Sequence, residues 1–186
     1  MITCMDNTPY NRKHSERSEH PVLLSLHTPP PWGGGEVQAL NMFRYFKDKP
    51  EYIIYRWVSN SATKKSQGKA SFDTLLLGLR WIFGMTARMV KHRPSRLYMT
   101  IPKGFGPFLR NGVILLLAPL LGVKVYGELP GTSFLFLERP GFKRQIGLWL
   151  LRRQTTMRVL SPSIRRMLEP LGIRRLDVIE NGVEAP

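Results

Sequence analysis

The sequence has little cysteine, few acidic residues and no long apolar run. Its one cysteine, Cys4, excludes an internal disulfide framework and a cysteine-based zinc site, and it fits a reducing compartment such as the cytoplasm. The longest apolar run, 113–123, is about half as long as a membrane-spanning helix, and a proline interrupts it. Residues 1–20 are polar, lack the apolar segment of a signal peptide, and are expected to form a flexible tail. We therefore expect a cytoplasmic protein without a transmembrane span.

The shortage of acidic residues leaves a strong positive charge. Lys and Arg number 28 against 13 Asp and Glu, a net charge of +15 that favours phosphate-bearing ligands, nucleic acid or an acidic membrane as partners. The chain has no RNP-type strand, zinc module or basic recognition helix, so we expect no specific nucleic-acid partner. The four histidines are scattered without the spacing of metal ligands, and no metal site is predicted.

Apolar periodicity divides residues 21–184 into alternating strands and helices. Strands are predicted at 22–26, 52–58, 96–101, 123–126, 157–160 and 176–179. Helices are predicted at 36–47, 72–92, 108–121 and 143–153, with Gly122 as a C-terminal cap of the third, and a last helix opens at Ser161 and Pro162. This alternation predicts one α/β domain with a Rossmann-like, doubly wound, mostly parallel sheet.

The loop after the first strand carries three consecutive glycines, Gly33, Gly34 and Gly35. Ligands of open α/β sheets bind beyond the carboxyl ends of the strands, and glycine lets backbone amides at a helix N-terminus approach a phosphate. The alternative is a tight turn that needs positive φ. Gln38 stands where the dinucleotide fingerprint needs its third glycine, and no Walker A lysine follows, so neither motif is present. His27 ends the first strand and either contacts a phosphate or acceptor or is a half-exposed strand-end histidine.

Both ends of the domain resemble one known family. Residues 25–40 join a strand, prolines, an aromatic residue, Gly-Gly-Gly-Glu and an amphipathic helix. Residues 159–184 join a strand ending in serine, a short helix and an Asn-Gly-Val turn at Asn181 and Gly182. Together they resemble the N-terminal domain of family 4 glycosyltransferases of the GT-B class, over about residues 21–184.

The resemblance implies retaining transfer of a sugar from a nucleotide sugar to a saccharide or lipid-linked acceptor, without a cofactor or an obligate metal. It implies that the three glycines lie near the donor diphosphate and the acceptor. It also implies that Asn181 and Gly182 form the hinge to a second, donor-binding domain.

The chain departs from this family in two ways. Members often have a histidine at the end of the fourth strand, where this sequence has Tyr126, followed by Gly127 and Glu128. Tyr126 and Glu128 are therefore the candidates for a polar role in the cleft, with a solvated loop carboxylate as the alternative for Glu128. The paired-glutamate segment of the donor domain is also missing. We expect that domain to be supplied in cis or in trans and the chain to be inactive alone. The alternatives are a non-catalytic partner subunit or an acceptor- or membrane-binding Rossmann-like module, and, as a third, a basic nucleic-acid-binding domain.

Ten Lys and Arg residues cluster between positions 139 and 175, around an apolar helix that carries Trp149. Such a helix is typical of a peripheral contact with an anionic membrane, here its inner face. In the alternative interpretation the apolar residues are core and the arginines form a solvated rim.

Overall fold

The computed structural model describes residues 21–28, 34–58, 72–129, 137, 140–154, 156–173 and 175–179. The predicted tail at 1–20, Gly33, Asn181 and Gly182 lie outside these ranges. Along the chain the elements are β1 (Val22–Thr28), α1 (Gly34–Phe46), β2 (Tyr52–Val58), α2 (Phe72–His92), β3 (Arg96–Thr100), α3 (Phe105–Leu120), β4 (Lys124–Leu129), α5 (Phe142–Leu151), β5 (Thr156–Val159), α6 (Pro162–Leu168), the 3-10 turn η3 (Glu169–Leu171) and β6 (Leu176–Val178).

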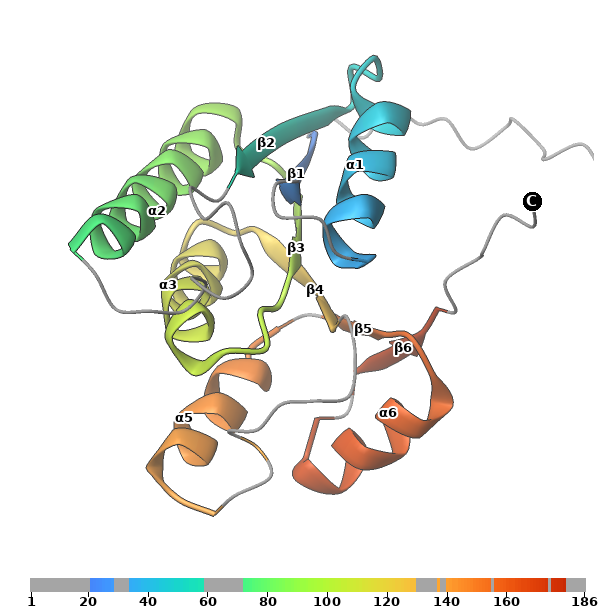
Figure 1. The fold of residues 1–186 in the computed structure, drawn as a ribbon. Helices are drawn as coiled ribbons and strands as arrows, with labels where there is room; N and C mark the ends of the chain where they lie inside the picture. The colour runs from blue at the N-terminus through green and yellow to red at the C-terminus, as the bar shows by residue number, and fades with distance from the viewer. Residues whose placement is uncertain are drawn as a thin grey trace, which may run out of the picture.

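The six strands form one parallel sheet in the order β2-β1-β3-β4-β5-β6. Helix α1 covers one face of the sheet, while α2, α3 and α5 cover the other (Figure 1). The protein is thus an α/β domain with a Rossmann-like, doubly wound sheet, and the predicted fold class is confirmed.

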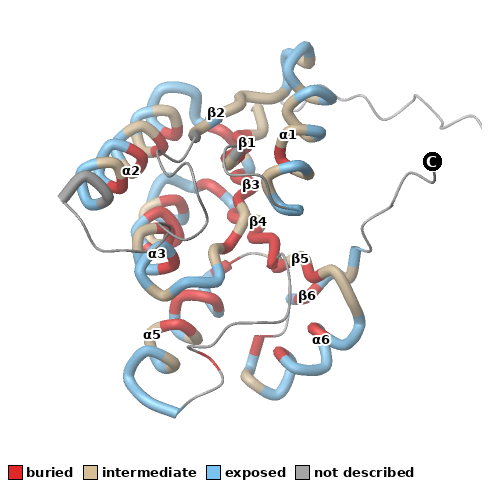
Figure 2. The backbone as a smooth tube through the Cα atoms, viewed as in Figure 1, coloured by how far each residue is buried: buried red, intermediate tan, exposed pale blue. Residues whose placement is uncertain are grey.

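The core has two layers that match these two faces. The larger cluster joins buried side chains of α2, α3, α5 and α6 to the sheet, and Trp81, Met85 and Phe108 are among its largest members. The smaller cluster joins Leu24 and Leu26 of β1 to α1. Strand β1 is therefore buried on both sides, as its continuous apolar sequence predicts (Figure 2).

Two predicted helix caps are confirmed. Gly122 follows α3 with a φ of +73°, and its amide donates to the Pro119 carbonyl at 3.0 Å. Ser161 precedes α6, where its hydroxyl accepts a hydrogen bond from the Ile164 amide at 3.4 Å.

Strand β4 is longer than predicted. The sequence places its end at Tyr126 because glycine and glutamate follow, but the strand continues to Leu129. Register explains the difference, since Glu128 lies opposite Thr100 of β3, and Leu129 lies opposite Val159 of β5. Pairing on both sides outweighs the weak strand propensity of glycine and glutamate.

Helix α3 packs closely on α5 at Gly112. A Cβ at this position would lie 2.7 Å from Cδ1 of Leu150, which is buried. We predict that Gly112→Ala lowers the free energy of unfolding by about 1–2 kcal/mol, because overpacking exceeds the helix propensity gained. Urea denaturation measures the change. Gly106→Ala in the same helix is the control, since its Cβ would meet nothing within 4 Å. Equal stability of the two variants would show that this helix contact is loose.

Candidate functional site at the carboxyl edge of the sheet

The strand order reverses direction at β1, which lies between β2 and β3. The chain leaves β1 for α1 on one face and leaves β3 for α3 on the other face (Figure 1). Because the two connections diverge, open α/β sheets have a crevice at this point, where ligands bind. The start of α1 and the ends of β1, β3 and β4 meet here.

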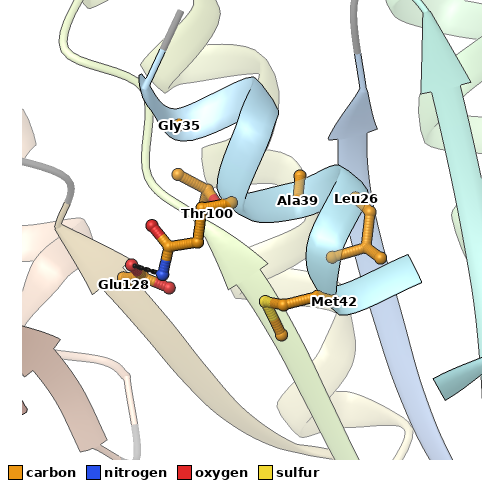
Figure 3. Close-up of a pocket in the computed structure, with 7 residues that line it drawn as sticks. Leu26, Gly35, Ala39, Met42, Thr100 and Glu128 are labelled. Carbon is orange, nitrogen blue, oxygen red and sulfur yellow. Dashed lines mark hydrogen bonds between the residues drawn. The ribbon is translucent and has the colours of Figure 1, made fainter. Parts of the chain in front are cut away.

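A small recess opens between α1 and the ends of these strands (Figure 3). Its lining residues are Leu26, Gly35, Gln38, Ala39, Met42, Thr100 and Glu128. The centre of a water molecule has only about 10 Å³ in which to move. The recess therefore cannot enclose a sugar, and it offers one wall of an open site.

Gly34 and Gly35 form the first turn of α1. Among the described residues, positive φ occurs at Gly122, Gly141, Gly172 and one arginine, so the tight-turn interpretation is wrong for Gly34 and Gly35. A Cβ at either position would meet nothing within 4 Å. Thus neither the backbone conformation nor packing against the described residues requires glycine here. The first amides of a helix have no acceptor within the helix and are available to a ligand.

Glu128 lies next to the end of β4 and is only 5% exposed. Its Oε1 accepts a hydrogen bond from Nε2 of Gln38 on α1 at 3.0 Å (Figure 3). The alternative of a solvated loop carboxylate is wrong, because β4 extends past this residue. Burial raises the pKa of Glu128, and the Gln38 hydrogen bond and the charge of Arg158 partly oppose the shift. The recess thus contains a carboxyl group that holds its proton more tightly than usual.

Tyr126 lies two residues earlier on the same face of β4, about 7 Å further from the carboxyl edge. Its side chain is half-buried and packs against the smaller core cluster beneath α1. The prediction that Tyr126 ends the fourth strand is wrong. Glu128 is the candidate that the structure places at the crevice.

His27 lies at the carboxyl end of β1 with its side chain 25% exposed. Its Nδ1 is 3.5 Å from Oε1 of Glu36, and its ring packs on Trp57 at 4.6 Å between centroids. Burial lowers the pKa of His27, Glu36 raises it, and the charge of Arg110 lowers it further. His27 is therefore neutral at pH 7, and its contact with Glu36 is a polar contact rather than an ion pair.

Sequence reasoning missed two residues of this edge. In the sequence Gln38 marks only the position of a missing glycine, because its partner Glu128 is 90 positions away. Arg110 is the second missed residue: its charge acts on His27, and its guanidinium lies 4.6 Å from the centroid of the Trp57 ring, against which His27 packs. One signal could have revealed it, because Arg110 is the single charged residue in the sequence of α3. Within the described ranges, no group of three or more His, Cys, Asp or Glu side chains could hold a metal ion.

The raised pKa of Glu128 predicts a pH-dependent stability difference. A carboxyl group whose pKa is raised on folding favours the folded state at low pH, and this contribution is lost as the pH rises through the folded pKa. Glu128→Gln keeps an acceptor for Gln38 and removes the buried charge. We expect the variant to be more stable than the parent at pH 8 by about 1 kcal/mol, with a smaller gap at pH 4.

Urea denaturation at the two pH values measures the difference. Asp177→Asn is the control, because Asp177 is an exposed carboxylate of β6 and its replacement should change stability by less than about 0.5 kcal/mol. Destabilisation by Glu128→Gln at pH 8 would contradict the prediction.

Comparisons with known proteins assign no family to this chain. No protein-family model matches it, and neither does any curated protein. Its function is therefore inferred from the fold and from the residues at the carboxyl edge.

Proposed function

We propose that this chain is the acceptor-side, N-terminal domain of a retaining glycosyltransferase. It would bind a nucleotide sugar and a saccharide or lipid-linked acceptor at the crevice between β1 and β3, and a second domain would supply most of the donor site. The observation that carries the proposal is the pair of glycines in the first turn of α1, which neither φ nor packing against the described residues requires.

A glycine inside a helix destabilises it by up to about 1 kcal/mol relative to alanine. No contact among the described residues offsets that cost at Gly34 or Gly35, because the space beside both is open. Open space beside amides at a helix N-terminus favours close approach of an anion. In sugar transfer the bond from the anomeric carbon to the diphosphate breaks, and the diphosphate leaves as an anion. The α1 amides would stabilise that charge.

Glu128 supports the acceptor side of the proposal. Its carboxyl group lies at the recess, hydrogen-bonded to Gln38 and isolated from bulk water. A carboxyl group in this position can accept a hydrogen bond from a sugar hydroxyl and hold the acceptor oxygen toward the donor. Its role would be to position the acceptor.

An anionic membrane surface is the second partner that we propose, and α2 supports it better than the basic helix expected from the sequence. In α5, Leu150 and Leu151 are buried and Trp149 is 49% exposed. The outward side of α2 exposes five large apolar side chains at helical spacing, with exposed Arg80 and Lys91 beside them; the five are Leu75, Leu76, Leu79, Phe83 and Val90. An apolar stripe flanked by cations fits the surface of a bilayer. Among the helices described, none is long and apolar enough to cross one.

The glycine argument predicts a variant that is more stable and yet binds less tightly. Gly35→Ala should increase the free energy of unfolding by up to about 1 kcal/mol, because its Cβ has room and alanine favours the helix. The same Cβ would block the approach to the amides, and we expect binding of UDP-, GDP- or ADP-sugars to weaken at least about tenfold, a loss of about 1.4 kcal/mol.

Calorimetric titration measures the affinity, with Gly106→Ala as the control. Gly106 also lies in the first turn of a helix, with open space around it, but it does not line the recess. Its replacement should affect stability in the same direction and leave the affinity unchanged. Undiminished binding by Gly35→Ala would contradict the proposed role of the loop.

The membrane proposal predicts that Phe83→Ser reduces sedimentation with phosphatidylglycerol vesicles at least threefold without unfolding the domain, because Phe83 is 71% exposed. Tyr45→Ser is the control, since Tyr45 is 64% exposed on α1, across the sheet from α2. Equal loss in both variants, or equal binding to phosphatidylcholine vesicles at low salt, would exclude this docking mode. Competition by DNA of any sequence would favour a general polyanion site instead.

A further inference from the structure

Among the described residues, one cation at the carboxyl edge is held among aromatic rings without an acidic partner. Arg110, in the second turn of α3, is half-buried, and its guanidinium lies 4.6 Å from the ring centroid of Trp57 and 4.8 Å from that of Trp81. Its Nε and Nη2 donate to Oδ1 of Asn111 at 3.2 and 3.1 Å. Among the ion pairs of the described residues, none includes Arg110. Burial lowers its pKa to about 10, so it remains charged at neutral pH.

This arrangement is costly for a structural residue. Removing a guanidinium from water without a counter-ion destabilises a domain, and contacts with aromatic rings offset only part of that cost. Asn111 accepts through a neutral amide oxygen, which leaves the charge uncompensated. The stem of Arg110 also packs closely against Gly78 on α2, where a Cβ would lie 3.3 Å from Cδ of the arginine. A half-buried cation that has no acidic partner among the described residues indicates a binding site for an anion.

The neighbours of Arg110 come from several elements that meet at the same edge. Trp57 and His27 lie near the carboxyl ends of β2 and β1, and Asn111 donates to the Thr100 carbonyl at the end of β3 at 3.2 Å. Two buried ring nitrogens of this cluster, Nε2 of His27 and Nε1 of Trp81, have no hydrogen-bond partner in the described part of the chain. The cluster therefore offers a ligand two ring nitrogens that can form hydrogen bonds as well as a positive charge.

We propose that Arg110 and His27 form a phosphate subsite of the crevice, on the α3 side of β1 and across that strand from the Glu128 recess. Its ligand would be a phosphate group of the nucleoside diphosphate or of a lipid-linked acceptor. The inference rests on the proposed function for the identity of that ligand, but binding of the anion requires no sugar transfer.

His27 makes the subsite sensitive to pH. The charged groups that face it are Glu36 from α1 and Arg110 from α3, while β2 presents the neutral ring of Trp57. An anion beside Arg110 opposes the effect of that positive charge on His27. Binding then favours uptake of a proton by the ring, and the anion binds more tightly as the pH falls from 8 to 6.

Calorimetric titration of the full chain tests the subsite with sulfate, which does not titrate in this range, and with pyrophosphate. We expect both anions to bind, and Arg110→Met to weaken binding at least tenfold. Arg88→Met is the matched control. Its guanidinium lies 4.1 Å from the ring centroid of Tyr55 and donates to the Gly84 carbonyl of its own helix, so binding should not change. Arg110→Lys keeps the charge and should retain part of the affinity if Arg110→Met fails to fold.

Unchanged affinity in a folded Arg110→Met, or no binding of either anion by the parent chain, would overturn the proposal. Sulfate should also raise the midpoint of the His27 titration, which NMR can follow. An unchanged midpoint would show that His27 does not belong to the subsite. Tighter binding of pyrophosphate than of glycerol phosphate identifies a nucleotide source, and the reverse identifies a lipid headgroup. If the anion binds at Arg110 but replacing Gly35 or Glu128 does not change the affinity for sugar ligands, the subsite is retained and the proposed transferase function is excluded.

Discussion

Parallel pairing of β1 with both β2 and β3 is the constraint on which the rest of the structure depends. A strand that is central and buried on both faces forces the first two crossovers in opposite directions, and it places α1 and α3 on opposite sides of the sheet. The crevice between their first turns follows from this topology. Gly35, His27, Glu128 and Arg110 reach the same edge, because the parallel strands end there and α1 and α3 begin beyond those ends.

The charged groups at this crevice have a different environment from the charged groups elsewhere in the domain. Glu128 is buried and Arg110 half-buried, each hydrogen-bonded to a neutral amide, and burial shifts both pKa values so that the uncharged form of each group is favoured. The basic residues of the last third are accommodated differently. Arg165 pairs with Glu169 at 2.6 Å, and Arg153 lies over the ring of Trp149 at 4.0 Å. These contacts fit a solvated rim, and they leave the outer side of α2 as the surface better suited to a bilayer.

The fold could be read from the sequence because it depends on local signals. Apolar strands, helical periodicity and caps such as Ser161 predicted the α/β class and the order of the elements. The site depends on contacts between distant positions, and it was predicted only in part. The end of β4 was misplaced because pairing on both sides keeps Gly127 and Glu128 in the strand. Arg110 was missed because the aromatic rings around it belong to β2 and α2. The sequence of α3 alone does not show which residues of other elements surround it.

The central claim is that the carboxyl edge at the strand reversal is where this domain binds phosphate-bearing sugar ligands. A crystal structure of the chain soaked with a nucleotide sugar tests it most directly. We expect the diphosphate against the first turn of α1, within hydrogen-bonding distance of the Gly34 or Gly35 amide or of the Arg110 guanidinium. A nucleotide sugar bound instead at the opposite edge of the sheet, against the basic residues before β5 and β6, would contradict the claim.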